Sequence, residues 1–498
     1  MGLGGTEKAG ALNLKALTTE RAMGIITFAL LFALAARIPI DTDTWWHIRS
    51  GEYILQNGVI YADPFSHTAF GQAWIDHSWG AQILLYGIWQ VGGLFGLMLY
   101  TAGLATLGLY FVWKASAGNH YVRAFALIFG AAAAAVFWSP RPHMLSFALS
   151  GLVLYLIHLY KREGVDRLWL IPILLALWGN LHAGFSIGFI FLVGTIGGET
   201  AAVLFNPKGE HTLTPRQIGK LALITVISAA ALVINPYGAQ MLAVPFQTVG
   251  IGVLRQYIQE WNSPNFQERQ TWGFILLAIA VFGAAGASKR RLDWTDFALV
   301  SGTGFLALLA GRNIAVFAVA ATPVLTYHLH SITQERGFLV RTAQTVSPRL
   351  ARLNLALVAI IVFAAAGKAI LVMEPITVQQ VIDSTLPRRA VEYMRENPPE
   401  GRMFNAYNWG GYLMYALPQY PVFVDGRTDL YGDTVLREYL DAALGGASWR
   451  EVLAKYAIDF VLVETGSGLA NRLNDEPGWR AAYTDEQASL FINETSPS

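Results

Sequence analysis

The sequence predicts a polytopic α-helical membrane protein that ends in an extracytoplasmic α/β domain. Charged residues make up 14% of the 498 residues and hydrophobic residues 54%, whereas a soluble chain is about 25% charged. Apolar runs of roughly 15–21 residues recur through the first three quarters of the chain, which suits membrane-spanning helices. Residues 375–498 instead have the mixed composition of a soluble domain. We therefore expect a transmembrane module over 1–374, with a polar outward loop at 40–80, and a soluble domain over 375–498.

Global features exclude several other classes of protein. The chain has no cysteine, so it can form neither disulfide bonds nor thiolate metal sites. The formal net charge is +1, and no basic stripe of the nucleic-acid-binding kind is present. Lys15 and Arg21 precede an apolar core, as in a cleavable signal peptide. A retained first span is the preferred interpretation, because the polar loop that follows has to stay tethered to the membrane.

The candidate membrane spans are the longest apolar segments of the chain. Glycine and proline interrupt several of them, and we expect about eleven spans. The segments are 22–39, 92–113, 122–138, 144–160, 168–180, 185–205, 219–234, 272–287, 294–309, 314–328 and 353–373.

Basic residues are distributed unequally between the two sets of connecting loops. The loops on the N-terminal side contain Lys8, Lys15, Arg21, Lys114, Arg123, Lys161, Arg162, Arg167, Lys208, Arg216, Lys220, Lys289, Arg290, Arg291, Arg336, Arg341, Arg349 and Arg352. The opposite loops contain only Arg49, Arg141, Arg255, Arg269 and Arg312. Since cytoplasmic loops are enriched in lysine and arginine, this predicts a multi-pass protein of the cytoplasmic membrane with a cytoplasmic N-terminus. The loops 41–79 and 235–270 and the C-terminal domain then face outward together.

The first outward loop, residues 41–79, is dense in ionisable groups. Such groups are costly beside a membrane and are kept where they have a function. Tryptophans alternate with them, as expected at the bilayer boundary. Residues 46–57 and 77–90 have mixed faces and predict helices that lie along the interface. Residues 61–66 predict a turn between them, because Pro64 fixes its own φ angle.

Asp41 and Asp43 are the first candidates for chemistry. In an extended segment, side chains two positions apart project to the same side. The two carboxylates then suit Mg²⁺ or Mn²⁺ binding beside a phosphate, or one of them suits a general base. The alternative is that they only cap the helix that follows. Asp76 and His77 are a second element of the same site, or a simple pair at the membrane boundary.

Three short outward turns carry further candidates. Arg141 lies between two prolines, next to His143, and a guanidinium held at membrane depth suits capture of a phosphate. The alternative is an arginine that extends toward lipid headgroups. Arg312 has the same kind of position between two later spans, and His182 lies in another short turn, where it is a donor for the same phosphate or a structural histidine.

The other outward segments offer residues for a sugar or an acceptor. Glu260 and Trp261 suit the hydroxyl groups and the faces of a sugar ring, although packing alone also explains them. In the soluble domain, Asp425 and Arg427 follow a strand, a common place for functional loops. A self-contained network, with Arg427 paired to Asp425 or Asp429, is the alternative.

The soluble domain alternates helix and strand signals, which predicts a small α/β layer. The predicted helices are Pro387–Glu396, Gly410–Leu417, Thr434–Leu440 and Trp449–Tyr456. The predicted strands are Met403–Asn405, Val422–Asp425, Phe460–Glu464, Ala481–Thr484 and Ser489–Ile492.

Together these features resemble the GT-C superfamily of membrane glycosyltransferases, which take sugars from polyprenyl-phosphate carriers. The resemblance rests on the acidic motif of Asp41 and Asp43 in the first outward loop, the interfacial helices, the many spans and the outward α/β domain. The string from Asp41 to Glu52, with Asp63–Ser66, Asn408–Tyr412 and Asp425–Asp429, is similar to an uncharacterised bacterial branch of that superfamily.

The resemblance implies sugar transfer, with inversion, to a glycan, lipid or protein acceptor at the outer face of the cytoplasmic membrane. Asp41 or Asp43 is then the catalytic base or a metal ligand; the family is mixed in its use of Mg²⁺ or Mn²⁺. The implied donor-phosphate residues are Arg141, His143, His182 and Arg312. The implied acceptor or sugar residues are His47, Asp76, His77, Glu260, Trp261, Asp425 and Arg427.

Two functions from other classes remain open from the sequence. A transporter or flippase for a lipid-linked glycan would bind through the same groups without cleaving. It predicts polar residues deep in many spans, whereas these spans are polar mainly at their outer ends. The other alternative is a non-catalytic scaffold that binds a lipid-linked glycan, against which the intact pair Asp41 and Asp43 argues.

Overall fold

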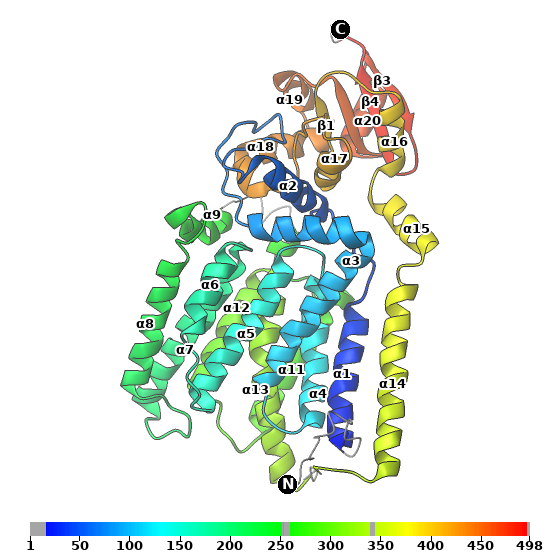
Figure 1. Cartoon of the computed structure of the whole chain (residues 1–498). Helices are drawn as coiled ribbons and strands as arrows, with labels where there is room; N and C mark the ends of the chain where they lie inside the picture. The colour runs from blue at the N-terminus through cyan, green and yellow to red at the C-terminus, as the bar shows by residue number, and fades with distance from the viewer. Residues whose placement is uncertain (1–15, 251, 253–258, 339–343, 496–498) are drawn as a thin grey trace, which may run out of the picture.

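The computed structural model describes residues 16–250, 252, 259–338 and 344–495 and combines a helical bundle with a small α/β part at one end (Figure 1). Within these residues, seven helices are long and apolar enough to cross a membrane, and α6 and α12 are shorter apolar helices. The predicted class, a helical membrane protein with a C-terminal sheet, is confirmed. The positions of Lys8, Lys15, Arg255 and Arg341, used above for orientation, lie outside the described residues.

A helix lies in each of the predicted spans. The bundle consists of α1 (Thr19–Ala35), α3 (Trp79–Lys114), α4 (His120–Ala134), α5 (His143–Arg162), α6 (Leu170–Gly179), α7 (Ser186–Phe205), α8 (Pro215–Ala231), α11 (Trp272–Ala287), α12 (Trp294–Leu309), α13 (Ile314–Glu335) and α14 (Pro348–Leu371). Both α1 and α8 have 17 residues, which is at the lower limit for a span. The number of about eleven crossings therefore stays a prediction.

Two helices form the platform between the bundle and the α/β part. They are α2 (Thr44–Asn57) and the first part of α3, which lies across the end of the bundle below α2 (Figure 1). Gly93 has a non-helical backbone with φ 51° and ends this first part, so the rest of α3 turns into the bundle. The predicted interfacial helix and the span after it are therefore one interrupted element. Gly51 permits the close crossing, because a Cβ there would overlap the carbonyl of Gln82.

The loop after α8 adds short helical pieces at the same end of the molecule. They are α9 (Val244–Gly250) and the 3₁₀ turns Gly238–Ala243, Gln259–Trp261 and Arg269–Thr271. The side chain of Tyr237 ties this loop to the first outward loop, since its hydroxyl donates to the carbonyl of Ile60 at 2.6 Å.

The C-terminal part is a mixed four-stranded sheet with helices around it. Its helices are α15 (Pro375–Thr385), α16 (Arg388–Glu396), α17 (Gly410–Ala416), α18 (Thr428–Ala443), α19 (Trp449–Lys455) and α20 (Gly468–Asn474). Its strands are β1 (Met403–Asn405), β2 (Phe460–Glu464), β3 (Trp479–Thr484) and β4 (Ala488–Asn493). The strand order is β1-β2-β4-β3, with β1 parallel to β2 and the other pairs antiparallel.

One predicted strand, Val422–Asp425, is not part of this sheet. The segment is extended and buried, but Val422 forms an isolated parallel bridge with Ser66 of the first outward loop. Its N–H donates to the carbonyl of Phe65 and its carbonyl accepts from the N–H of His67, both at 3.0 Å. The strand-like pattern of this segment is therefore explained by its pairing with the outward loop. This pairing joins the loop to the α/β part.

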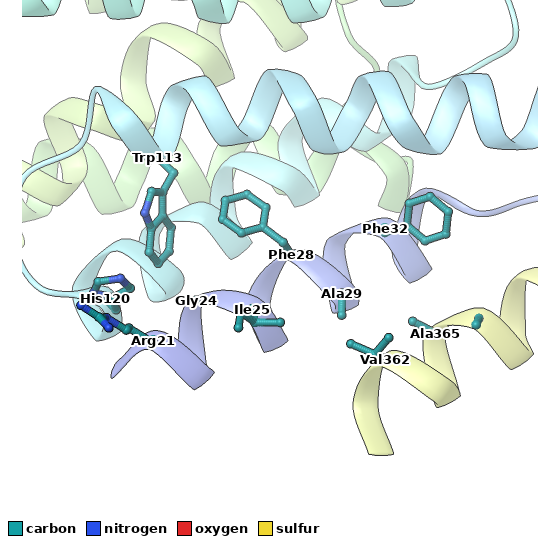
Figure 2. Close-up of a pocket in the computed structure, with 11 residues that line it drawn as sticks. Arg21, Gly24, Ile25, Phe28, Ala29, Phe32, Trp113, His120, Val362 and Ala365 are labelled. Atoms are coloured by element: carbon teal, nitrogen blue, oxygen red, sulfur yellow. The ribbon is translucent and has the colours of Figure 1, made fainter. Parts of the chain in front are cut away.

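A cavity of about 750 Å³ lies between α1, α4 and α14, and Figure 2 shows its lining. Ala29 of α1 lies nearest Val362 of α14, Phe28 points toward Trp113, and Arg21 and His120 lie together at one end. The lining contains no carboxylate. This cavity between membrane helices therefore lacks the carboxylate that the predicted reaction needs.

Candidate active site

A second cavity, of about 940 Å³, lies where the bundle, the first outward loop and the α/β part meet. Most of the predicted site residues line it. These are Asp43, His47, His77, Arg141, His143, His182, Glu260, Trp261 and Arg312. Residues from six separate segments of the chain thus converge on one space.

The two acidic residues before α2 have different local roles. Asp41 accepts the N–H of Asp43 through Oδ1 at 2.9 Å, which closes a turn before the helix. Asp43 is the residue that precedes the first helical turn, yet its side chain makes no capping hydrogen bond. The capping alternative therefore does not explain Asp43, whose carboxylate lines the cavity.

Arg141 brings three carboxylates together. Its Nη1 lies 3.1 Å from Oδ2 of Asp43 and 3.7 Å from Oδ2 of Asp41. Its Nη2 lies 3.4 Å from Oε2 of Glu260. The two aspartates therefore do face the same side, as predicted, and the rigid turn between α4 and α5 supplies their counter-charge.

The three groups differ in the pKa that this arrangement gives them. Burial raises the pKa of Asp43 to about 7, because the nearby charges of Asp41 and Glu260 add to the effect while Arg141 opposes it. For Glu260 burial acts in the same direction, but Arg141 and Arg312 lower its pKa to about 2. At neutral pH Glu260 is ionised, and Asp43 is poised between its two forms. A carboxyl with such a pKa is suited to general-base chemistry.

The predicted metal site at Asp41 and Asp43 does not fit the residues. The guanidinium of Arg141 occupies the cation position between the two carboxylates. In the part of the chain that the structure describes, no three His, Cys, Asp or Glu side chains group as metal ligands. A divalent ion would have to displace Arg141, so we derive no chemical step through a metal.

Arg312 is a second cation in the cavity, and it is less neutralised. Its guanidinium stacks over the ring of Trp261, 4.2 Å from the ring centroid. Within the described residues Arg312 forms no ion pair, and Glu260, which lines the same cavity, pairs with Arg141. Since a cation held on an aromatic face keeps its donors available, Arg312 suits a phosphate ligand better than Arg141 does.

Four of the ten histidines line this cavity. His143 contacts the carbonyl of Phe137 through Nε2 at 2.6 Å, so that nitrogen donates. His77 Nδ1 lies 2.9 Å from the hydroxyl of Ser78. His47 is buried, its Nδ1 has no hydrogen-bond partner among the described residues, and burial lowers its pKa well below the usual range. These rings therefore act as neutral groups beside the two arginines.

Besides Asp41, three predicted site residues do not line the cavity. Asp76 is buried and accepts from Nε2 of Gln82 at 2.6 Å, and burial raises its pKa to about 7. Asp425 and Arg427 are fully buried, and Arg427 donates to Asp425 at 2.8 and 2.6 Å and to Asp63 at 2.5 Å. None of the three lines the cavity, so their predicted contact with a sugar or an acceptor gains no support from its lining.

The self-contained alternative is thus the correct interpretation for Arg427, although its second partner was not foreseen. Asp63 comes from the first outward loop, where it also accepts the backbone N–H groups of Phe65 and Ser66. The hydroxyl of Tyr431 donates to Asp425 at 2.6 Å. This buried cluster joins the first outward loop to the α/β part.

The α/β part supplies cavity residues that the sequence interpretation missed. Gly426, Thr428 and Asp429 line the cavity next to the sealed cluster. A Cβ on Gly426 would overlap Oδ1 of Asp43 and would lie 2.9 Å from Nε1 of Trp46, so only glycine permits this approach. Gly426 within Asp425–Asp429 was a visible signal of a close approach. The sequence did not show that the approaching segment is the one that contains Asp43.

The opposite wall of the cavity is apolar. It is formed by the outer ends of α5 and α7 and by the segments near them. Its residues include Phe147, Phe185, Phe189, Ile190 and Val193. The cavity therefore offers a polar end beside Asp43 and an apolar wall that continues into the bundle.

Comparisons with known proteins establish the fold. No family model matches the chain, and no curated protein matches it in sequence. Among solved structures, the oligosaccharyltransferase of Archaeoglobus fulgidus tethered to an acceptor peptide has a TM-score of 0.52 at 15% identity, covering 95% of this chain and 74% of that one. The apo form of the same enzyme gives 0.52 at 14% identity, with 89% and 69% covered.

ArnT from Cupriavidus metallidurans in the apo state is similar over almost its whole length. The TM-score is 0.52 at 12% identity, with 94% of this chain and 97% of that chain covered. Both proteins are GT-C glycosyltransferases. At such low identity the likeness concerns the fold alone, and the chain has the GT-C fold.

Proposed function

We propose that the protein is a membrane glycosyltransferase that moves a sugar from a polyprenyl-phosphate donor to an acceptor, with inversion. The observation that carries the proposal is the polar end of the site cavity. There Asp43, a carboxyl with a pKa of about 7, lies beside Arg141 and in the same cavity as Arg312. A base and two permanent cations are the groups that this reaction requires.

In the proposed reaction Asp43 removes the proton from an acceptor hydroxyl. The oxygen of that hydroxyl forms a bond to the anomeric carbon, which passes through an oxocarbenium-like state. The bond from the anomeric carbon to the phosphate oxygen breaks, and its electron pair leaves with the polyprenyl phosphate. Because the leaving group is an anion, it needs positive charge more than a proton, and Arg312 and Arg141 supply this charge.

The shape of the cavity supports a lipid-linked donor. The apolar wall formed by α5 and α7 is suited to the first isoprene units, while the sugar and phosphate would occupy the polar end. Asp429 and Thr428 of the α/β part face the same space and are suited to the acceptor side. The solved oligosaccharyltransferase carries its acceptor peptide in the same fold, which is compatible with a peptide, glycan or lipid acceptor here.

The orientation is part of the same proposal. Residues of α2 and of the α/β part line the site cavity, and these elements lie at one end of the bundle (Figure 1). The distribution of basic residues predicts that this end is at the outer face of the cytoplasmic membrane. The boundary between the transmembrane module, 1–374, and the soluble domain, 375–498, belongs to this proposal as well.

Donor turnover with water as the acceptor of the sugar tests the function without knowledge of the natural acceptor. Purified protein is incubated with a panel of polyprenyl-phosphate sugars, with and without Mg²⁺ or Mn²⁺, and the released polyprenyl phosphate is measured. We expect release without added metal and a loss of about 10²- to 10⁴-fold in Asp43→Asn, the usual contribution of a positioned base. Asp41→Asn should lose less, because Asp41 touches the site mainly through Arg141.

A matched control is Asp166→Asn, which removes a partly exposed carboxylate that pairs with Lys220. This variant should release the lipid at the wild-type rate. Tight binding of the donor lipid without release, unchanged in Asp43→Asn, would instead support a transporter or a binding scaffold. Release that requires Mn²⁺ or Mg²⁺ would contradict the role given to Arg141.

A further inference from the structure

A chain of three side chains leads from the bundle to the ring of His182. The indole Nε1–H of Trp178 donates to Oγ of Ser146 at 2.7 Å. Oγ of Ser146 lies 2.8 Å from Nδ1 of His182, and the backbone N–H of Gly184 donates to the same Nδ1 at 3.0 Å. Trp178 and Ser146 are buried, whereas His182 is partly exposed and lines the site cavity.

These contacts determine which ring nitrogen of His182 carries the hydrogen. A backbone N–H can only donate, so Nδ1, which accepts from Gly184, carries no hydrogen. The hydroxyl of Ser146 must then also donate to Nδ1, and its oxygen is free to accept from Trp178, as observed. A neutral imidazole has one N–H, which is therefore at Nε2.

The other ring nitrogen remains available in the cavity. Among the described residues, no hydrogen-bond partner contacts Nε2 of His182. The nearest aromatic neighbour, His77, lies edge-on with its ring centroid 5.8 Å away. Nε2–H is thus a donor of fixed direction that none of the described residues uses.

The sequence is adapted to this geometry at Gly184. A Cβ at this position would overlap Oγ of Ser146 and would lie 2.7 Å from Nδ1 of His182. Any other residue would therefore push apart the two groups that fix the ring. Gly184 therefore contributes in two ways to the contact with Nδ1 of His182: its N–H donates the hydrogen bond, and its lack of a side chain leaves room for Ser146.

We infer that Trp178, Ser146 and Gly184 are positioning residues that hold His182 as a neutral Nε2–H tautomer, so that it donates one hydrogen bond to the phosphate of the lipid-linked donor. The inference rests on the proposed function for the identity of the ligand only. An uncharged donor orients the phosphate without adding a third positive charge to those of Arg141 and Arg312. It also supplies the bond at every pH at which the ring remains neutral.

Nitrogen NMR of the purified protein tests the tautomer without any activity assay. With ¹⁵N-labelled histidine, the two ring shifts distinguish Nε2–H, Nδ1–H and the imidazolium. His182→Phe identifies the signals of this residue. We expect the Nε2–H form at pH 7 and a change of the Nε2 signal when undecaprenyl phosphate is added. A hydrogen at Nδ1, an imidazolium, or no response to the lipid overturns the inference.

Kinetics then separate positioning from direct contact. His182→Phe should lower donor release by about 10- to 100-fold, the factor of a hydrogen bond to a charged group, and Ser146→Ala by about 2- to 10-fold, that of a neutral one. If Ser146 acts through His182, adding Ser146→Ala to His182→Phe has no further effect. Independent, multiplying losses would overturn the positioning role.

Gly184→Ala and Gly197→Ala are the matched pair of backbone variants. Gly197 lies further along the same helical segment and has open space around its Cβ position, so its substitution should leave the tautomer signals unchanged. Gly184→Ala should produce mixed tautomers. If the tautomer is confirmed but no donor sugar is turned over, the proposed function fails while the fixed ring stands.

Discussion

Two clusters of arginine and carboxylates differ in how they meet water, although their chemistry is the same. Arg427 and its partners Asp63 and Asp425 have side chains with 0% exposure, and the contacts are 2.5 and 2.6 Å long. Arg141 and Asp43 have side chains with 20% and 23% exposure, and their contact is 3.1 Å. The first cluster is closed on itself, whereas the second faces a cavity.

This difference in exposure indicates that the charges of the Arg427 cluster hold segments together, whereas those of the Arg141 cluster are available to a ligand. A buried arginine with short contacts to two carboxylates is closed off from a ligand, and its removal leaves those charges unpaired. A cavity arginine with longer contacts can exchange a carboxylate for a phosphate at small cost. The two clusters are connected through Gly426, which lies between Asp425 and Arg427 and touches Asp43.

The largest expected effect breaks the closed cluster. Arg427→Met should destabilise the protein by about 3–5 kcal/mol, because Asp63 and Asp425 would remain buried without a counter-charge. Thermal unfolding in detergent measures this effect. Arg480→Met is the control, since Arg480 forms an ion pair with Glu494 in which both side chains are 55% exposed, and such pairs contribute about 0–1 kcal/mol. Equal unfolding temperatures for the two variants would contradict the assembly role.

The second largest effect is expected from a substitution at Gly426, which connects the two clusters but belongs to neither ion-pair network. Gly426→Ala should lower donor turnover by up to about 100-fold, because displacing a catalytic group by an ångström can cost that much. The added Cβ overlaps the end of the Asp43 side chain rather than backbone, so thermal stability should change little. Gly302→Ala, with open space at its Cβ position, should retain full turnover. Undiminished turnover in Gly426→Ala would show that the position of Asp43 does not depend on its contact with the α/β part.

The pH profile sharpens the distinction further. Asp43 has a pKa of about 7 against a usual value of 3.8, and the base must be ionised. Donor turnover should therefore fall about tenfold per pH unit below 7 and level off above it. An acid with a raised pKa binds its proton more tightly in the folded state, so its contribution to stability is complete below about pH 4 and is lost as the pH rises to about 7.

Asp76 needs a control in that experiment, because its pKa is also raised to about 7. Since Asp76 does not line the cavity, Asp76→Asn should keep the midpoint of the turnover profile. A profile that becomes flat in Asp76→Asn would assign the titration to Asp76 and remove the argument for Asp43.

The smallest effect concerns the edge of the closed cluster. The indole of Trp74 donates to Oδ2 of Asp429 at 3.0 Å, and the guanidinium of Arg427 lies 5.1 Å from its ring centroid. Trp74→Phe keeps an aromatic ring but loses the hydrogen bond, so we expect a loss of about 1–2 kcal/mol. Trp272→Phe, at an exposed tryptophan, should lose less in the same thermal unfolding experiment.

Much of the fold could be predicted because membrane helices and amphipathic strands leave local signals. The apolar runs predicted a helix in each span, and the alternation after residue 375 predicted β1, β2, β3 and β4 to within a few residues. The prediction was wrong at Val422–Asp425, whose apolar pattern suits a strand. Periodicity reports that such a segment is buried and extended but does not identify the segment with which it pairs.

The site was predicted unevenly for the same reason. Asp43, Arg141 and Glu260 were recognised because a charged group next to an apolar span is conspicuous. Gly426 and Ser146 were missed, because a small residue shows its role only through what approaches it. For Arg427 the sequence left open a sugar or acceptor role and a self-contained network, since it does not show which charges are sealed from water.

By itself, the sequence determined the class of the protein and the segments that carry its charges. These properties depend on composition and on neighbours along the chain. Only the tertiary structure decided that Arg427 pairs with Asp63, which lies 364 positions away in the chain, and that Arg141 rather than a metal lies between Asp41 and Asp43. The physical reason is that a pairing over such a separation depends on how the elements pack, and no local pattern encodes the distance between two side chains.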